Sequence, residues 1–240
     1  MSNAYYQPGS ERAGKVNELF ASIAPRYDRI NDLQSFGMHH RWKDRLVALA
    51  ALKPGDHALD ICCGTGDITE RLAAKGAKTI GLDFTAEMLE VARVRAVKTP
   101  AHQSGQLTYV QGDAMKLPFA DNSFEAVTVG FGLRNLAEWK TGLREMHRAA
   151  KPSGRLLVLD FGRPDNALWR LLYFSYLRVV VPVYGKLFCD NWSAYAYILE
   201  SLKAYPAQRG VESAMRELEC REVRVINFFG GAMSINYGLK

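Results

Sequence analysis

Cysteine is scarce in this sequence and is not arranged for metal binding. The 240 residues include four cysteines, Cys62, Cys63, Cys189 and Cys220, and no two of them are spaced as C-x-x-C. A structural zinc site needs four closely placed sulfur or nitrogen ligands, so we predict no metal site. We expect reduced thiols that serve as small buried side chains.

The sequence also lacks a signal peptide and a membrane-spanning segment. Residues 1–8 have neither the basic nor the apolar stretch of an export signal, so we expect a cytoplasmic protein. A spanning helix needs about 18 or more apolar residues in succession. The nearest candidate, Leu168–Val183, is interrupted by Arg170 and Arg178, and charges near the centre of a bilayer are costly.

Internal repeats and low-complexity tracts are missing as well. Hydrophobic residues make up 48% of the chain and charged residues 23%, which is ordinary globular composition and excludes a disordered or collagen-like protein. The length allows one large domain, with or without an appendage. A formal net charge of +6 favours an anionic partner, either nucleic acid, acidic lipid or an anionic ligand.

What the sequence does contain is an alternation of short apolar runs and helical patterns. Residues 16–52 are predicted to be helical, with a kink or end at Pro25. Strands spaced by helices predict a mostly parallel sheet with helices on both faces. Gly230 and Gly231 predict a final antiparallel hairpin. The expected strands are 57–62, 77–83, 107–111, 124–130, 155–160, 220–226 and 232–237, and the expected helices after the first region are 69–75, 86–97 and 139–150.

The stretch Leu59–Asp67 is the most informative part of the sequence. A predicted strand leads into Gly64 and Gly66 and then into a helix, which lets the backbone turn sharply and approach a ligand. A dinucleotide fingerprint would have a third glycine where Thr69 stands. Asp83 ends the next strand, at the position of an acid that binds a ribose.

Asp113 follows the third strand, so three acids, with Asp60 and Asp83, end successive strands. Side chains at the ends of neighbouring parallel strands can converge on one ligand. The three acids therefore indicate a site that binds an adenosine and does not rely on contacts with phosphate groups. The alternative interpretation is that Asp60 and Asp113 only cap turns, as aspartate often does.

These residues resemble the class I S-adenosylmethionine-dependent methyltransferases. More specific blocks, Ala24–Asp28, Asn31-Asp32, Ser35–His39, Trp42-Lys43, Phe131–Asn135, Ala194–Tyr197, Glu200-Ser201 and Tyr205-Pro206, resemble the family that C-methylates quinone precursors in menaquinone and ubiquinone biosynthesis. The resemblance extends from about Val16 to the C-terminus. It implies a Rossmann-like fold with a seven-stranded sheet, a helical lid over residues 1–52 and a methyltransferase domain over 53–240.

The resemblance also implies S-adenosylmethionine as methyl donor and a lipophilic, polyprenylated quinol as acceptor. A serine that is common in the family is Gly130 here, so only a backbone contact is expected at that position. The residues expected to bind the cofactor are Tyr27, Asp60, Gly64, Thr65, Gly66, Asp83, Phe84, Asp113, Ala114 and Gly130.

Methylation of a ring carbon requires alignment with the donor and removal of a hydroxyl proton. Arg134 cannot act as a base, because a guanidinium stays protonated, so we expect it to stabilise the quinolate oxygen. Asn135 would orient a water or the hydroxyl, and the proton would pass to a carboxylate or to His39. We place Asp28 with Tyr27 on the lid and group it with the catalytic residues.

The acceptor's apolar tail predicts an apolar entrance, for which Leu168–Phe188 is the candidate. Apolar residues are interspersed there with Arg170, Arg178 and Lys186, a mixture that suits a membrane interface. The alternative is an ordinary segment packed on the sheet. With Arg41, Lys43, Arg45 and Arg163, these cations would attract the protein to the inner face of an anionic membrane. The apolar residues in question are Trp169, Leu172, Tyr173, Tyr176, Leu177, Val180 and Val181.

Three other functions are alternatives to quinol methylation. An RNA methyltransferase of the amino-group class would have an Asn/Asp-Pro-Pro-aromatic motif where this chain has Gly130–Leu133, and we expect no nucleic-acid partner. A nicotinamide-dependent dehydrogenase and a non-catalytic cofactor-binding protein are the others. The choice between a naphthoquinol, which we favour, and a benzoquinol stays open, as does a homodimer.

Overall fold

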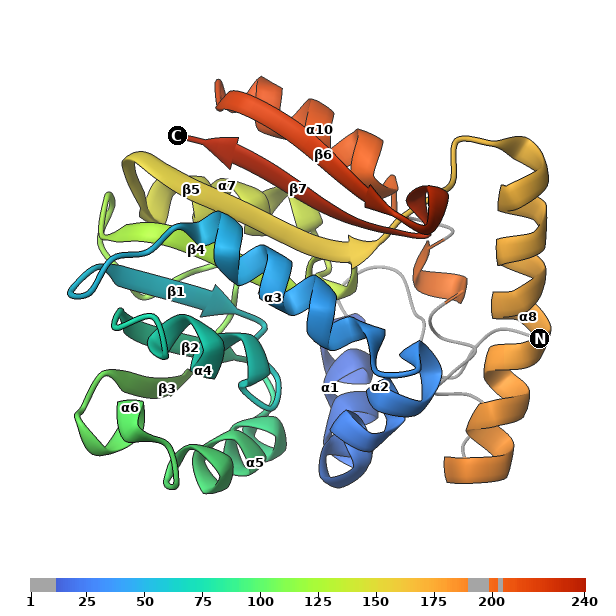
Figure 1. Ribbon diagram of the computed structural model, residues 1–240, viewed down its shortest axis with the longest axis horizontal. Coiled ribbons are helices and arrows are strands. Elements are labelled where there is room, and N and C mark those ends of the chain that lie inside the picture. The colour runs from blue at the N-terminus through green and yellow to red at the C-terminus, as the bar shows by residue number, and fades with distance from the viewer. Residues whose placement is uncertain (1–11, 190–198, 203–204) are drawn as a thin grey trace.

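The computed structural model describes residues 12–189, 199–202 and 205–240, with the side chains of the long helix described as far as Val179 (Figure 1). The block 194–197, the side chains of Val180, Val181 and Lys186, and Cys189 as a thiol lie outside this description. Cys62, Cys63 and Cys220 are free thiols, as expected. No helix in the described part is long and apolar enough to cross a bilayer.

Within these residues one sheet has seven strands in the order β3-β2-β1-β4-β5-β7-β6. The first five strands pair in parallel, and β7 pairs antiparallel with both β5 and β6. This confirms the predicted mixed sheet of the class I methyltransferase fold with its C-terminal hairpin. The strands are β1 His57–Ile61, β2 Lys78–Asp83, β3 Leu107–Gln111, β4 Phe124–Gly130, β5 Ala150–Phe161, β6 Arg221–Phe228 and β7 Met233–Leu239.

Most of the predicted elements begin and end close to their predicted limits, but no helix was predicted over Pro100–Gln103, Ala167–Cys189 or Ala207–Glu217. The helices are α1 Arg12–Ile23, α2 Tyr27–Ser35, α3 Met38–Ala50, α4 Asp67–Ala73, α5 Ala86–Ala96, α6 Pro100–Gln103, α7 Trp139–Ala149, α8 Ala167–Cys189 and α10 Ala207–Glu217. Short 3-10 turns are η1 Ala24–Arg26, η2 Leu133–Asn135 and η3 Phe229–Gly231. Pro25 lies in the break between α1 and α2, where the kink was predicted.

The predicted start of β5 at Arg155 was wrong, because the strand begins at Ala150. Its register against β4 shifts between Phe124 and Ala126, and Ser153 takes a positive φ of 65° within the strand. The Pro-Ser-Gly sequence therefore forms an irregularity inside a strand, not a turn before one. Local turn residues do not reveal this, because the pairing is decided by the distant strand β4 and the chain end at Lys240, whose carbonyl accepts from Ser153 N.

The side chains of the central strands alternate between two cores, as the period of a strand requires. Leu59, Val127 and Val158 point into a cluster that includes residues of α7 and α10. Ala58, Ala126 and Leu157 point to the opposite face, into a cluster with residues of α3 and α4. Helices thus cover both faces, and the carboxyl ends of the parallel strands are left at one edge.

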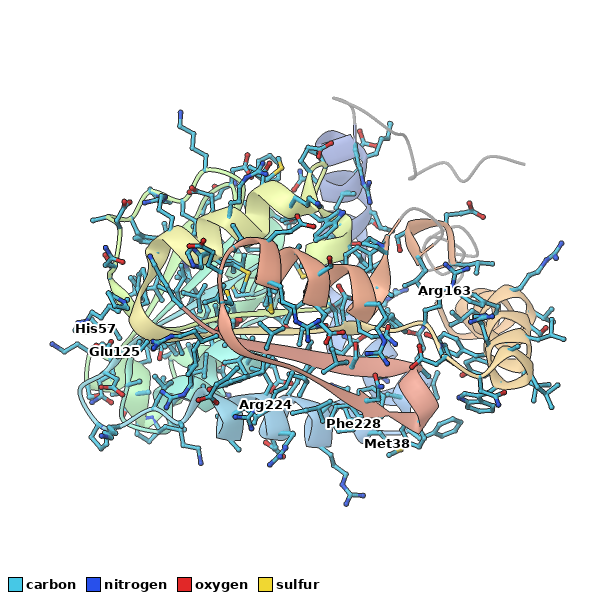
Figure 2. The ribbon with its side chains drawn as sticks, turned by 90° about the horizontal axis from the view of Figure 1, so that it is seen from above. Met38, His57, Glu125, Arg163, Arg224 and Phe228 are labelled. Atoms are coloured by element: carbon cyan, nitrogen blue, oxygen red, sulfur yellow. The ribbon has the colours of Figure 1, made fainter. Side chains whose placement is uncertain are left out.

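The N-terminal helices divide into two groups. Trp42, Leu46 and Val47 of α3 are buried in the cluster beneath the sheet, and Met38 and Phe228 pack on this cluster where α3 begins and β6 ends (Figure 2). By contrast, α1 and α2 lie beyond the carboxyl ends of the strands, between the sheet and α8 (Figure 1). We propose that the lid consists of α1 and α2, and that α3 belongs to the sheet domain.

Candidate active site

Two hollows open at the carboxyl edge of the sheet, one against the glycine loop and one between the N-terminal helices and α8. The first, called here the loop cleft, is closed on one side by α1. It is lined by Ala13, Val16, Asn17, Phe20, Tyr27, Cys62, Gly64, Leu82, Asp83, Phe84, Thr85, Met88, Gly112, Asp113, Ala114, Met115, Gly130, Phe131, Gly132, Asn135, Leu136 and Ala137.

The second hollow, called here the apolar chamber, has a volume of about 590 Å³. Its walls are mainly aliphatic and aromatic, with Arg134, His39, Asn31, Gln34 and Ser35 as the polar exceptions. Phe20, Tyr27 and Phe131 line both hollows, so the two meet at these three rings. The other lining residues are Leu19, Ile23, Ile30, Phe36, Met38, Trp42, Phe161, Trp169, Leu172, Tyr173, Tyr176, Leu177, Phe229, Ala232 and Met233.

The glycine loop turns through left-handed backbone conformations. Cys62, Gly64 and Gly66 have φ values of 51°, 56° and 84°, which glycine adopts readily and other residues rarely. At Gly66 an added Cβ would lie 2.1 Å from the Tyr109 hydroxyl. Gly66 does not line the loop cleft, and a glycine is needed there because Tyr109 of β3 packs against it. Gly64 lines the cleft itself.

Asp83 lies at the cleft as expected and is tied to the glycine loop. Its Oδ2 accepts from Gly64 N at 2.8 Å, and its Oδ1 accepts from Thr85 N at 2.9 Å. Burial raises the pKa of this carboxyl, while the backbone donors lower it. Each oxygen retains capacity to accept a further bond, so the carboxylate can receive hydroxyl groups of a ribose.

The segment that follows β3 lies at the cleft, as the sequence predicted. Asp113 and Ala114 line the cleft, and Asp113 Oδ1 accepts from Met115 N at 2.8 Å. The exposed ring of Phe84 also lies in the wall. The turn-capping interpretation of Asp113 therefore holds alongside its position at the cleft, because its second oxygen accepts no hydrogen bond described in the structure.

Asp60 lies elsewhere than expected. It shares the face of Ala58, which is turned toward α3 and α4, and it accepts hydrogen bonds from Thr69 Oγ1 and Thr128 Oγ1, each at 2.7 Å. It does not line the cleft. Burial raises its pKa to about 7, and its place in the structure is that of a link between β1, β4 and α4.

Asp28 and Thr65 fasten the lid to the loop. Thr65 Oγ1 donates to Asp28 Oδ1 at 2.7 Å, and Arg95 of α5 donates to Asp28 Oδ2 at 2.7 Å. Neither Asp28 nor Thr65 lines a hollow. Asp28 therefore holds the lid in place, and nothing in its contacts supports grouping it with the catalytic residues. The Thr65 hydroxyl is hydrogen-bonded to the lid.

The segment after β4 is the partition between the two hollows. Phe131 has a φ of 62°, which costs free energy for a residue with a Cβ, and Gly132 packs so closely that an added Cβ would lie 2.3 Å from Cys62 Cβ. The next turn sends neighbours to different sides. Arg134 lines the apolar chamber, and Asn135 lines the loop cleft.

Arg134 is buried and has a carboxylate partner that the sequence interpretation missed. Its Nη1 donates to Asp160 Oδ1 at 2.6 Å, and its backbone N donates to Asp160 Oδ2 at 3.3 Å. The guanidinium also lies 4.8 Å from the ring centroid of Phe161. An acid at the end of β5 was a signal of the same kind as Asp83 and Asp113.

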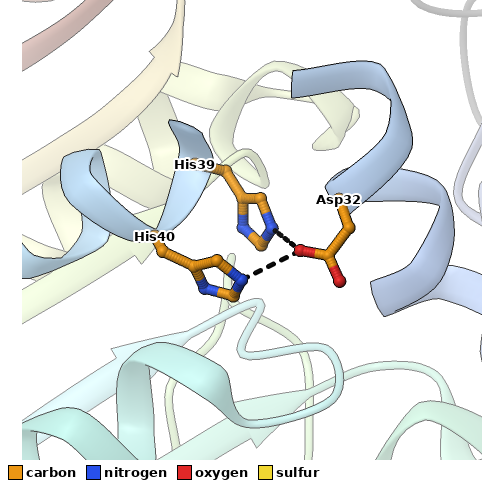
Figure 3. Close-up of side chains that lie close together, drawn as sticks. All are labelled: Asp32, His39 and His40. Carbon is orange, nitrogen blue, oxygen red and sulfur yellow. Dashed lines mark hydrogen bonds and ion pairs between the residues drawn. The ribbon is translucent and has the colours of Figure 1, made fainter. Parts of the chain in front are cut away.

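His39 is buried in the chamber wall at the start of α3, with 3% of its surface exposed. Its Nε2 lies 2.8 Å from Asp32 Oδ1, and His40 Nε2 lies 2.9 Å from the same oxygen (Figure 3). Asp32 was quoted from the sequence as part of the Asn31-Asp32 block but was given no role, and Asn17 of the loop cleft was not singled out at all. Both lie on helices, where a single polar residue gives no spacing signal.

The polar groups that line the loop cleft suit S-adenosylmethionine as a ligand. Asp83 and Asp113 supply acceptors for the hydroxyl and amino groups of an adenosine, and carboxylates favour a sulfonium over a phosphate. Asn17 Oδ1 is buried and has no hydrogen-bond partner among the described residues, so it offers an acceptor to a ligand ammonium. Tyr27 closes the cleft near Gly64, and burial raises the pKa of its phenol.

We predict that Gly130→Ser weakens S-adenosylmethionine binding and lowers stability. A Cβ at Gly130 would lie 2.3 Å from Ile68 Cδ1, and Ile68 is buried against the sheet. Overpacking of this kind costs about 1–3 kcal/mol. Adding Ile68→Val removes the obstructing methyl group and restores binding in the double variant, measured by calorimetry and thermal unfolding, with Ile68→Val alone as control. Equal losses in the single and double variants would contradict this account.

Known proteins resemble this chain over nearly its whole length. The model of the ubiE/COQ5 methyltransferase family matches residues 9–240. Demethylmenaquinone methyltransferase of Listeria monocytogenes serotype 4a is 37% identical over 230 residues, covering 94% of this chain and 95% of the relative. Ubiquinone/menaquinone biosynthesis C-methyltransferase UbiE of Pseudomonas savastanoi pv. phaseolicola is 40% identical over 236 residues, covering 97% and 91%.

Solved structures agree in fold. An S-adenosylmethionine-dependent methyltransferase of Aquifex aeolicus has a TM-score of 0.60 at 17% identity and covers 88% of this chain and 97% of its own. One of Methanococcus maripaludis, described as a methyltransferase of the same cofactor, has a TM-score of 0.62 at 18% identity, covering 90% and 92%. With its family match and its relatives, the chain belongs to the ubiE/COQ5 methyltransferase family, the S-adenosylmethionine-dependent C-methyltransferases of quinone biosynthesis.

Proposed function

We propose that the protein methylates a ring carbon of a polyprenylated quinol, with demethylmenaquinol as the favoured acceptor and the benzoquinol of ubiquinone biosynthesis as the alternative. The observation that supports this most is the junction of the two hollows at Phe20, Tyr27 and Phe131. A cleft that carries the carboxylates of Asp83 and Asp113, suited to the donor, and an apolar chamber, suited to the acceptor, share these three rings as walls. The walls of the chamber suit the fused apolar ring of a naphthoquinol.

Bound S-adenosylmethionine supplies an electrophilic methyl group on a sulfonium. In this proposal Asp83 holds the ribose, Asp113 the adenine side and Asn17 the ammonium. The lid then covers the donor, because Asp28 fastens α2 to Thr65 and to Arg95. Exclusion of water at the junction strengthens the electrostatic interactions inside it.

Arg134 is proposed to stabilise the developing charge on the quinolate oxygen. It lies in the chamber wall and its guanidinium is anchored by Asp160, so it is held in place before the acceptor enters. A preorganised donor of this kind contributes most when it requires no rearrangement during the reaction. Asn135, held through Nδ2 by the Phe131 carbonyl at 3.1 Å, faces the cleft and orients the reacting groups.

Methyl transfer to reduced quinols tests the proposed activity directly. The purified protein is incubated with labelled S-adenosylmethionine and reduced short-tail demethylmenaquinol, and in parallel with the benzoquinol precursor of ubiquinone. We expect a C-methylated naphthoquinol at the higher kcat/KM, because the fused ring fills more of the apolar chamber. A preference for the benzoquinol would select the alternative, and methylation of neither quinol would contradict the proposal.

We predict that the double variant Arg134→Ala with Asp160→Asn has at least about 100-fold lower kcat and unchanged affinity for S-adenosylmethionine. Loss of one preorganised oxyanion donor has that magnitude. The Asp160 change is included because a buried carboxylate left without its partner destabilises a protein by about 3–5 kcal/mol. Asp160→Asn alone is the control. Turnover equal to that of the control would refute the role of Arg134.

We also propose that α8 and the chamber mouth rest on the anionic inner face of the membrane that contains the acceptor. Phe36, Trp169, Leu172 and Phe229 line the chamber and are also exposed. Leu168 and Leu171 extend this apolar surface along α8, with 68% and 64% of their surfaces exposed. A tail leaving the chamber would therefore emerge among apolar side chains.

Some of the cations that we assigned to this surface are engaged elsewhere. Lys43 is buried and pairs with Asp67 at 2.7 Å, so it is removed from the membrane-facing set. Arg170 turns back to donate to the Pro164 carbonyl at 3.1 Å. Arg41, Arg45, Arg163 and Arg178 are exposed and remain in the proposal.

We predict that Leu168→Glu with Leu171→Glu reduces flotation with anionic liposomes at least about tenfold, since each buried leucine contributes about 1.5–3 kcal/mol. The matched control is Val94→Glu with Val97→Glu, which has the same spacing at α5, where both valines are exposed. Turnover of a short-tail quinol stays unchanged in both variants. Equal flotation of the two double variants would contradict the proposed surface.

A further inference from the structure

A carboxylate and two histidines meet where α2 ends and α3 begins (Figure 3). Asp32 Oδ1 lies 2.8 Å from His39 Nε2 and 2.9 Å from His40 Nε2. These three residues form the one group of potential metal ligands found among the described residues. His39 is buried in the chamber wall, whereas His40 is partly exposed and does not line the chamber.

The hydrogen-bond partners determine where the ring protons are. An ionised carboxylate only accepts, so both Nε2 atoms must donate to Asp32. Arg71 Nη2, which can only donate, lies 3.0 Å from His40 Nδ1, so that nitrogen carries a lone pair. In His39 the proton on Nε2 leaves a lone pair on Nδ1 of the neutral ring. This Nδ1 is buried without a hydrogen-bond partner among the described residues.

This arrangement disfavours a metal ion and favours proton transfer. A metal would need the Nε2 lone pair of His40, which would move the ring proton to Nδ1 and place it against the guanidinium of Arg71. The same guanidinium is fixed to Asp67 through Nε at 2.8 Å and also pairs with Asp44. Rotation of Arg71 away from His40 would therefore break two ion pairs.

Burial and the charges around His39 together hold its pKa below the usual value of a histidine. Burial lowers its pKa, and Lys43, one turn further along α3, lowers it too. Asp32 of α2 raises the pKa, and the His40 ring, which is tilted against it at 3.9 Å between centroids, lowers it. Asp67 of α4 pairs with Lys43, and Arg134 faces the chamber from the segment after β4.

We infer that His39 Nδ1 accepts the hydroxyl proton of the acceptor, and that Asp32, itself held by His40, is the positioning residue that fixes the His39 tautomer. This inference rests on the proposed quinol methylation. His39 is the base that the sequence left undecided, and Asp32 gives it the hydrogen-bonded partner that orients a general base.

The step balances as follows. The hydroxyl proton moves to Nδ1, and the electron pair of the O–H bond stays on the quinolate oxygen. The ring carbon forms a bond to the methyl carbon as the carbon–sulfur bond breaks, with that pair going to sulfur. The methylated carbon then loses its own proton to solvent, which restores the aromatic ring. The imidazolium returns its proton to the oxygen, so one proton is released for each methyl transferred.

The first arm of the test is a ¹⁵N NMR titration of the histidines in the full chain without substrate. We expect His39 in the Nε2–H tautomer with a pKa below its usual range, and a still lower pKa in Asp32→Asn, because a neutral amide no longer stabilises the imidazolium. A His39 proton on Nδ1, or a pKa that does not respond to Asp32→Asn, would overturn the inference. This arm holds whether or not any quinol is methylated.

The second arm measures quinol turnover against pH. Turnover should fall about 100-fold in His39→Gln and about tenfold in Asp32→Asn, with the KM for S-adenosylmethionine unchanged. The acid limb should move to lower pH in Asp32→Asn, because loss of the carboxylate lowers the pKa of the base. The exposed His102 provides the control, His102→Gln, with wild-type turnover.

The outcomes separate the inference from the function on which it rests. Wild-type protein that methylates no quinol contradicts the proposed function and leaves the NMR arm to decide the histidine pair. If Asp32→Asn turns over quinol and the acid limb of its pH profile stays where it is in the wild type, the roles of His39 and Asp32 are contradicted. The proposed quinol methylation is then unaffected. Activity that a chelator abolishes and Zn²⁺ restores would show a metal site at the three residues and overturn the inference.

Discussion

The buried ion pair between Arg134 and Asp160 is the interaction on which the architecture of the site depends. The carboxylate at the end of β5 accepts from both the guanidinium and the backbone of Arg134, so it fixes the turn that follows β4. That turn places Arg134 in one hollow and Asn135 in the other. Since the partition between donor and acceptor spaces is built from this turn, the two spaces can meet only where Phe131 and the lid leave them open.

The sheet could be predicted from the sequence because its signals are local. The alternation of apolar runs and helical patterns and the glycines at 64 and 66 are enough to place a parallel sheet with a ligand at its carboxyl edge. Asp83 and Asp113 were found for the same reason, since Asp83 ends β2 and Asp113 comes two residues after the end of β3. The start of β5 was not found, because an irregular pairing with β4 overrides the turn propensity of Pro152 to Gly154.

The sequence predicted where a residue lies in the fold better than it predicted the direction in which its side chain points. Asp60 is one residue from the strand end, and the strand period turns it into the α3 and α4 layer, where two threonines bind it. Asp28 seemed a catalytic acid because of its motif, yet Thr65 and Arg95, distant in sequence, use both of its oxygens. Asp32 and Asp160 stood in a quoted block and at a strand end, but only the tertiary contacts revealed His39 and Arg134 as their partners.

The central claim is that donor and acceptor meet at Phe20, Tyr27 and Phe131 from two separate hollows. The most direct measurement is a crystal structure of the complex with S-adenosylhomocysteine and a short-tail naphthoquinone. The account predicts the nucleoside at Asp83 and Asp113, and the naphthoquinone ring in the apolar chamber beside Phe131 and Arg134. A quinone bound outside the chamber, or a nucleoside that does not contact Asp83, would contradict it.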